Sequence, residues 1–197
     1  MTDVKHLTLE ELETGLAQVA QSPKDAGELK LIVRRPANGE REVLEMGELD
    51  LAVGLIGDNW KTRGSAKTPD GSARPDHQIT ITNARMIALV ARQQERWPLA
   101  GDQLFIDLDL SATNLPPGTQ LRIGSTIVEV TPPPHDGCKK FAERFGVETV
   151  KFMSSPEYKE MHLRGINAKV VRAGMIRIGD RVSKGRATVE NSSPLGF

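Results

Sequence analysis

The sequence predicts a mainly β fold with peripheral helices, built as a closed or nearly closed β-barrel. Many short runs alternate apolar and polar residues with the period of a strand, and several of them end at glycine. Two of these strand ends match in pattern, LRIG at 121–124 and IRIG at 176–179, which suggests two equivalent corners. A chain of 197 residues is long enough for one domain with a sizeable core. We expect a helix and linker over residues 1–28, the barrel over 29–185 and a strand or tail over 186–197.

The N-terminal segment predicts an amphipathic helix. Thr8 and Glu11 have the spacing of a capping box, and the pattern stops at Pro23. Between Thr8 and Pro23, apolar residues recur at helical spacing: Leu9, Leu12, Leu16 and Val19. We expect this helix to cover one end of the core, with docking of a partner as the alternative.

The first half of the barrel is predicted from four runs. Residues 28–35 and 41–46 are strand-like and flank the turn cluster 36–39, which indicates a hairpin. Residues 78–82 form a strand candidate, and Asn83 is placed to cap a helix that continues to residue 92. Residues 103–110 alternate with period two, so their four aliphatic side chains share one face.

Two hairpins are predicted in the second half. Residues 119–124 and 126–130 meet at Gly124 and Ser125, a pair that two-residue hairpin turns prefer. Residues 165–182 repeat the pattern with a predicted turn at 173–174.

A long stretch before residue 78 is rich in Gly, Ser, Pro, Asp and basic residues. Loops of about twenty residues inside a compact domain are usually functional or disordered. Its residues could converge on an anionic ligand or simply face solvent: Asp58, Asn59, Trp60, Lys61, Arg63, Arg74, Asp76 and His77.

Composition and missing motifs exclude several classes of function. Lys plus Arg and Asp plus Glu each total 26, so no net field favours nucleic acid or an anionic membrane as partner. No apolar run approaches the roughly 20 residues of a membrane span, and the N-terminus lacks the apolar region of a signal peptide, so we expect a cytoplasmic protein. The chain has no P-loop, Rossmann, nucleophile-elbow or HExxH motif.

Cys138 is the only cysteine of the chain and follows three prolines at 132–134. Asp136 is predicted to cap a short helix that Gly146 ends, so Cys138 falls in its first turn. Helix-terminal N–H groups favour a thiolate there, and the neighbouring His135 or lysines would add to this effect.

Cys138 also has a structural interpretation. Its spacing from Phe141 and Phe145 places it on the apolar face of the helix, where a lone cysteine can serve as packing. His135 could share a metal with the sulfur or act as its general base.

Taken together, the segments resemble the MOSC domain, in particular its small, stand-alone bacterial members. The resemblance covers roughly residues 29–182 and lies in GLIGD with the basic loop, LRIGSTIVEV, PPPHDGCKKFAERFG and RGINAKVVRAGMIRIGDRV. The last segment satisfies the pattern RGxxAxVxxxGxIxxGD. Gly137 departs from the proline that many relatives carry before the cysteine, and 75–78 departs from a His-Gly-Gly segment of several bacterial relatives.

The resemblance implies a MOSC-like β-barrel whose cysteine either carries sulfur as a persulfide or ligates molybdenum in the pterin cofactor. On this chain that residue is Cys138, with His135 as the second catalytic candidate. The candidates for binding the molybdenum cofactor, above all its phosphate, are Arg63, Arg74, His77, Lys139, Lys140, Arg164 and Asn167.

The implied partners follow from the two roles. A sulfur carrier would be loaded by a cysteine desulfurase, which itself holds the pyridoxal phosphate, and a cofactor-binding protein would serve a molybdoenzyme or act as an oxidoreductase. The rival hypothesis is a non-catalytic binding barrel in which Cys138 is structural.

Overall fold

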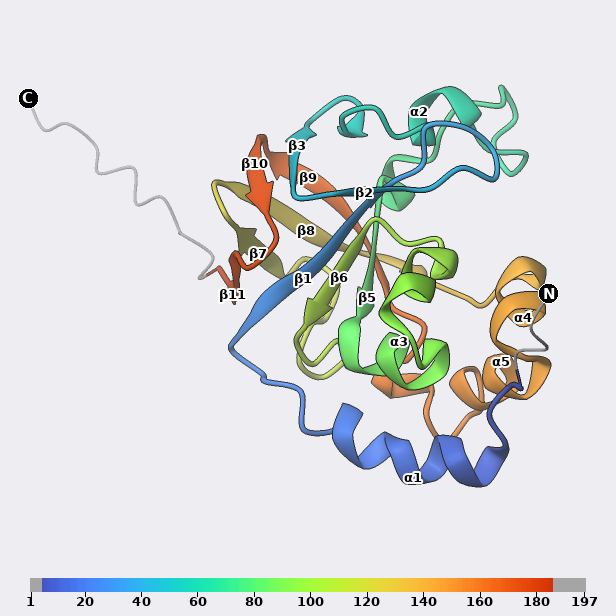
Figure 1. The fold of residues 1–197 in the computed structure, drawn as a ribbon. Coiled ribbons are helices and arrows are strands. Elements are labelled where there is room, and N and C mark those ends of the chain that lie inside the picture. The colour runs from blue at the N-terminus through green and yellow to red at the C-terminus, as the bar shows by residue number, and fades with distance from the viewer. Residues whose placement is uncertain (1–4, 186–197) are drawn as a thin grey trace, which may run out of the picture.

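The computed structural model describes residues 5–185 and contains a closed barrel of seven strands (Figure 1). Around the barrel, each strand pairs with the next and the last closes on the first. The order is β1 (Ala26–Arg34), β6 (Leu104–Asp107), β5 (Ile79–Asn83), β9 (Ile166–Arg172), β8 (Thr126–Pro134), β7 (Gln120–Ile123) and β11 (Arg181–Lys184). Only β5 and β6 run parallel within the barrel. The predicted β-barrel is confirmed.

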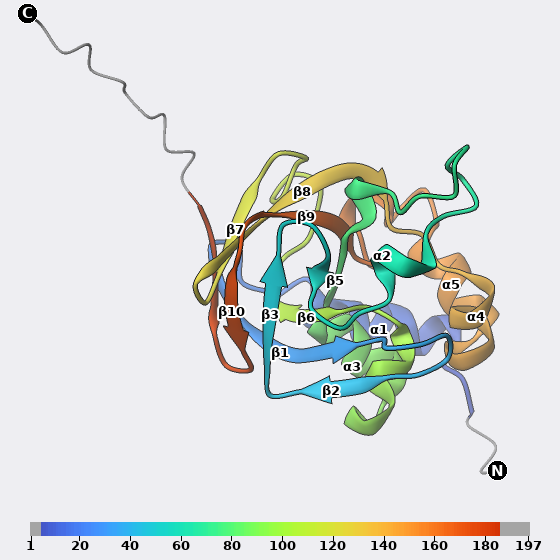
Figure 2. The same cartoon turned by 90° about the horizontal axis from the view of Figure 1, so that it is seen from above.

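A smaller sheet and one short strand complete the β structure. Strand β2 (Glu42–Leu44) pairs with β1 as the predicted hairpin. The second sheet has the order β10 (Gly174–Arg177), β3 (Met46–Asp50) and β4 (Gly54–Leu55). Figure 2 shows β3 and β10 side by side at one end of the barrel.

The predicted hairpin over 165–182 is wrong. Strand β9 pairs with β5 and β8, whereas β10 leaves the barrel and pairs with β3. Gly174 permits this departure because a Cβ there would lie 2.6 Å from the Ser125 hydroxyl. Ile176 then becomes fully buried in the core. Alternation alone indicates strands but does not identify their partners.

Helices cover one side of the barrel (Figure 1). They are α1 (Leu9–Val19), α3 (Ala84–Ala91), α4 (Lys139–Phe145) and α5 (Val147–Met153). A short α2 (Trp60–Arg63) lies apart from them, on the side of β3 (Figure 1). The chain also forms the 3-10 turns η1 (Pro75–His77), η2 (Gln94–Ala100) and η3 (Lys159–Met161). The Thr8–Glu11 capping box and the Asn83 cap are both present as predicted. Leu9 of the predicted apolar stripe is nevertheless half exposed.

Two hydrophobic cores result from this arrangement. The first fills the barrel and includes Leu29, Ile79 and Ile106, and the second lies between the barrel and the helices and includes Phe105 and Phe141. Each fully buried aliphatic or aromatic side chain stabilises the fold by about 1.5–3 kcal/mol. The barrel is therefore a packed core rather than a channel.

Two further sequence predictions concern the ends and the membrane. Strand β1 starts at Ala26, slightly before the predicted boundary at 29, and the predicted strand or tail over 186–197 lies outside the described residues. Among residues 5–185, no helix has the length and apolar character that crossing a membrane requires.

Candidate functional site

A cavity of about 290 Å³ opens at one end of the barrel, beside the N-terminal end of α4. We call it the arginine cavity, because it is lined by Arg35, Arg41, Arg63, Arg144 and Arg164 together with Cys138. The lining residues come from the turn between β1 and β2, from α2, from η1 and from α4. Figure 2 shows these segments around the same end of the molecule, although they are far apart in the sequence.

The buried Arg35–Asp58 pair forms one wall of the cavity. Nε and Nη2 of Arg35 donate to the two carboxylate oxygens of Asp58 at 2.8 and 2.9 Å, and Nη1 donates to the Gly101 carbonyl at 3.0 Å. Asp58 also accepts from the backbone N–H groups of Arg35 and Trp60. The pair therefore fixes the end of β1 against the start of α2.

A second buried network joins Asp102, Arg164 and His135. Arg164 donates to one Asp102 oxygen at 2.7 Å, and His135 Nε2 lies 2.5 Å from the other. The Arg164 guanidinium also donates to the Ala100 carbonyl and stacks over Phe141, 4.5 Å from the ring centre. Asp102 thus ties the cysteine segment to β9 and α4.

The charge state of this network follows from its surroundings. Burial alone would raise the pKa of the Asp102 carboxyl, but the charge of Arg164 and the hydrogen bonds from Arg164 and His135 lower it to about 2. Burial, reinforced by Arg164, lowers the pKa of His135. Asp102 is therefore ionised at neutral pH and His135 is neutral. The ionised carboxylate has no proton to give, so His135 Nε2 carries the N–H that it accepts.

The cavity is lined by more basic side chains than acidic ones, so it has an excess of positive charge. Burial lowers the pKa of both Arg41 and Arg63, and nearby arginines lower it further. Within the part of the chain that the structure describes, Asp136 is the only acidic residue of the lining. Positive groups are crowded in this way where an anion binds between them.

Several buried polar atoms of the same cavity have no hydrogen-bond partner within the described residues. They are Nε of Arg41, Oδ1 of Asn59, Nδ1 of His77, Nε of Arg164 and Oδ1 of Asn167. Unpaired buried polar groups are rare in folded proteins, and each costs about 1–3 kcal/mol. Their concentration in one cavity indicates a site that a polar ligand completes.

Cys138 lies at the cavity with an exposed side chain. It is the N-terminal capping residue of α4, whose first helical residue is Lys139. The predicted cap at Asp136 is therefore wrong by two residues, because the proline segment stays extended as part of β8. The predicted position of Cys138 on the apolar face is also wrong, since Phe141 and Phe145 are buried and the sulfur is not. A buried packing role for Cys138 is excluded.

Asn167 fixes the approach to Cys138. Its Nδ2 donates to the carbonyls of Pro133 and Pro134 at 3.1 Å each, which holds the proline segment against β9. Gly165 lets the start of β9 pack closely between β5 and the cysteine segment, because it has φ +121° and a Cβ there would lie 2.3 Å from the Ile81 carbonyl and 3.0 Å from the His135 ring.

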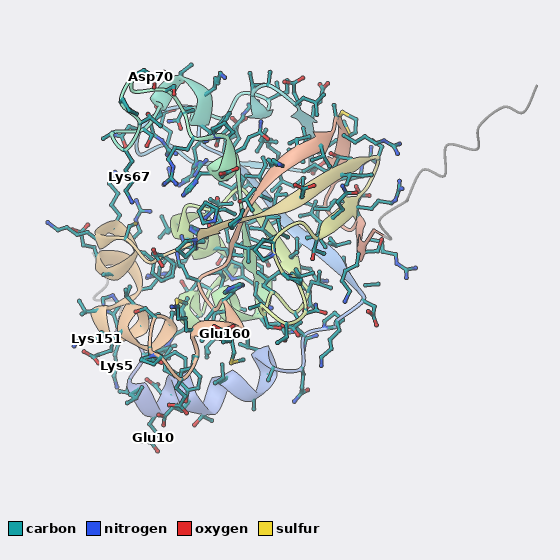
Figure 3. All side chains as sticks on the ribbon, turned by 180° about the vertical axis from the view of Figure 1, so that it is seen from behind. Lys5, Glu10, Lys67, Asp70, Lys151 and Glu160 are labelled. Atoms are coloured by element: carbon teal, nitrogen blue, oxygen red, sulfur yellow. The ribbon has the colours of Figure 1, made fainter. Side chains whose placement is uncertain are left out.

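The cavity brings most of the predicted site residues together. Those that line it are Arg63, His77, His135, Cys138, Lys140, Arg164 and Asn167. The two exceptions are Arg74 and Lys139. Arg74 precedes η1 outside the lining, and Lys139 points to solvent and pairs with Glu143 at 4.0 Å. Figure 3 shows Lys67 and Asp70 on the long loop that precedes η1. Within residues 5–185, no group of three or more His, Cys, Asp or Glu side chains is placed to hold a metal ion.

Four residues of the site were not predicted from the sequence: Arg35, Arg41, Arg144 and Asp102. Arg35 and Arg41 flank the predicted turn 36–39, so both could have been assigned to one end of the hairpin. Asp102 and Arg144 have no comparable signal, because only the tertiary packing brings them near Cys138.

Comparisons with known proteins agree with this fold. The family model for the MOSC domain matches residues 68–183. Among solved structures, the YuaD protein of Bacillus subtilis is similar with a TM-score of 0.59 and 17% identity, over 80% of this chain and 94% of that one. YiiM of Escherichia coli is similar with a TM-score of 0.53 and 18% identity, over 81% of this chain and 70% of that one. No curated protein matches the chain.

Proposed function

Because the chain belongs to the MOSC domain family, we propose that it binds the molybdenum cofactor in the arginine cavity, with Cys138 as the protein ligand to the metal. The observation that carries this proposal is the meeting of three features in one cavity. An exposed thiol, a surplus of arginines and several unpaired buried polar atoms all line it.

The polar lining fits the cofactor's chemistry. A phosphate group would be bound by guanidinium groups, for which Arg41, Arg63 and Arg144 are the candidates because Arg35 and Arg164 already pair with buried aspartates. The unpaired oxygens of Asn59 and Asn167 can accept hydrogen bonds from N–H groups of a pterin ring. The volume of about 290 Å³ lies at the lower end of ordinary ligand pockets, and the cavity is open to solvent.

Cys138 suits the metal because a thiolate is a soft ligand. When bound, the cofactor would supply a redox-active metal. The chain's own residues would bind the phosphate of the cofactor, orient its pterin ring and provide one sulfur ligand to the metal. Asn167 and Gly165 keep the cysteine segment in place, so their role is positioning.

The exposure of Cys138 also favours a second candidate, a sulfur carrier. In that reaction the Cys138 thiolate attacks the outer sulfur of a persulfide on a cysteine desulfurase, and the desulfurase cysteine leaves as a thiolate. The arginine surplus and unpaired polar atoms have no task in this reaction, and for that reason we rank it second.

Molybdenum and pterin content tests the proposal. Full-length protein from a molybdenum-replete host is expected to contain both, and Cys138→Ala is expected to lose most of the metal. A combined Arg63→Gln and Arg144→Gln variant should lose about 100-fold or more in affinity, because each charge-assisted hydrogen bond contributes about 1.5–3 kcal/mol and about 1.4 kcal/mol corresponds to tenfold. Arg122 is an exposed residue of β7 outside the cavity, so Arg122→Gln is the matched control and should bind the cofactor normally.

Two outcomes would contradict the proposal. Wild type without molybdenum or pterin would exclude cofactor binding, and equal content in wild type and Cys138→Ala would exclude the cysteine ligand. One additional sulfur atom in the intact mass of wild type, absent from Cys138→Ala, would favour the carrier instead.

A further inference from the structure

A second cavity lies behind the cysteine segment, on the other side of His135 from the arginine cavity. We call it the rear cavity. It has a volume of about 150 Å³ and is lined by residues 134–137 and 162–165 together with Val150, Met153 and Glu160. Figure 3 labels Glu160 on this side of the molecule. His135 lines both cavities, as do Asp136 and Arg164.

We propose that His135 transfers protons between the arginine cavity and the rear cavity, with Asp102 as its positioning residue. The site would then catalyse a reaction that includes a proton transfer, in addition to binding the cofactor. This inference rests on the proposed function, because the proton would be exchanged with the molecule bound beside Cys138. The geometry of this relay can be tested without that molecule.

The first support is the orientation of the imidazole ring. Nε2 of His135 is 2.5 Å from Asp102, and Asp102 is itself held by Arg164 at 2.7 Å. The Asp102 side chain is fully buried, and the His135 side chain is 14% exposed. A buried carboxylate that accepts from one ring nitrogen leaves the other nitrogen, Nδ1, as the proton acceptor. The same arrangement of carboxylate and imidazole serves general bases elsewhere.

The second support is that, among the described residues, His135 is the one histidine that lines both cavities. His77 lines only the arginine cavity, and His162 lines only the rear cavity, where its Nδ1 lies 3.0 Å from the Leu110 carbonyl. Asp136 lines both cavities, and Lys159 and Glu160 line the rear cavity. The positive charges of Arg164 and Arg35 lower the pKa of His135 further. Burial lowers the pKa of His77, the other histidine of the arginine cavity, and its Nδ1 is buried without a partner.

The third support is the closeness with which the chain packs around His135. A Cβ at Gly165 would lie 3.0 Å from Cδ2 of the His135 ring, and a Cβ at Gly137 would lie 2.9 Å from a Val150 methyl. Side chains at these two positions would press on the ring and into the wall of the rear cavity. The cavity has room for several waters, each of which occupies about 30 Å³ of liquid.

The proposed step is balanced within the site. A proton passes from an O–H, N–H or S–H group of the bound molecule to Nδ1 of His135, and the donor atom keeps the electron pair. The imidazolium that forms is stabilised by the Asp102 carboxylate. The proton then returns to the product or leaves to water in the rear cavity, so no oxidant or reductant is needed for this step.

Histidine NMR of the full chain tests the relay. Long-range proton–nitrogen spectra of ¹⁵N-histidine protein at pH 7, assigned with His135→Gln, should show His135 fixed as the Nε2–H tautomer. Asp102→Asn should convert this signal to an average of both tautomers. Asp107→Asn, a carboxylate that also pairs with an arginine but lines neither cavity, is the matched control and should leave the His135 signal unchanged.

The route through the rear cavity has its own measurement. Val150→Phe fills that cavity, and exchange of the Nδ1 proton of His135 with water, followed at a pH where the ring is protonated, should slow several-fold, with thermal unfolding confirming that the variant folds. An Nδ1–H tautomer in wild type, an unchanged signal in Asp102→Asn, or an unchanged exchange rate in Val150→Phe would overturn the proposal. None of these results depends on whether the cofactor binds, so failure of the relay and failure of cofactor binding are distinguishable.

Discussion

Replacing Asp58 by alanine should be among the most destabilising single changes at the site. The Asp58 side chain is fully buried and its partner Arg35 is 8% exposed. Removal of the carboxylate leaves a buried guanidinium that has lost both of its hydrogen bonds to Asp58. Breaking one partner of a buried pair costs about 3–5 kcal/mol.

The chain contains a matched comparison for this prediction. Arg85 and Asp107 form a pair with the same two-bond geometry, but their side chains are 33% and 22% exposed. Because solvent screens this pair, Asp107→Ala should cost at most about 1 kcal/mol. The difference between the two variants therefore measures the effect of burial together with the backbone hydrogen bonds that Asp58 accepts from Arg35 and Trp60.

Urea unfolding followed by circular dichroism measures both variants. With a slope of about 2 kcal/mol per molar urea, the midpoint should fall by roughly 2 M for Asp58→Ala and by less than about 0.5 M for Asp107→Ala. Equal midpoints for the two variants would refute the reasoning that the Arg35–Asp58 pair is buried and structural.

Three further predictions concern the cysteine segment and its surroundings. Iodoacetamide should label Cys138 fully in the folded protein, because its side chain is exposed, and labelling only after denaturation would contradict the structure. Gly165→Ala should lower the thermal unfolding temperature more than Gly118→Ala, since both glycines have positive φ but only the first would press a Cβ against backbone; equal losses would count against this packing. Burial lowers the pKa of His77 and His135 in the folded protein below the usual 6.5. As the pH drops below 6.5, these histidines therefore take up protons in the unfolded chain before they do so in the folded chain, and the free energy of unfolding should fall. Urea midpoints between pH 7.5 and 5.5 measure this fall, which should be smaller in His135→Gln, and a flat profile would disprove it.

Local patterns predicted the elements of the fold well. The capping box at Thr8, the cap at Asn83 and the turn at Gly124 each depend on residues within a few positions of one another, and all three are present. Pairing of distant strands was harder to predict. The segment around Gly174 alternates like a hairpin, yet close approach to Ser125 sends β10 into another sheet.

The site was predicted where its chemistry is visible in single segments. Cys138 and His135 stand out because the thiol is unique and the imidazole is nearby in sequence. Asp102 could not be found in this way, since its importance comes from contacts with His135 and Arg164 that lie 33 and 62 residues away. The exposure of Cys138 also depends on where α4 begins, a boundary that the extended prolines displaced by two residues.

Native mass spectrometry of the full chain from a molybdenum-replete host tests the central claim most directly. We predict a bound group with the isotope pattern of molybdenum and the mass of a pterin, released on denaturation and missing from Cys138→Ser. A wild-type chain that carries no such group, or that carries only an extra sulfur atom surviving denaturation, would contradict cofactor binding in the arginine cavity.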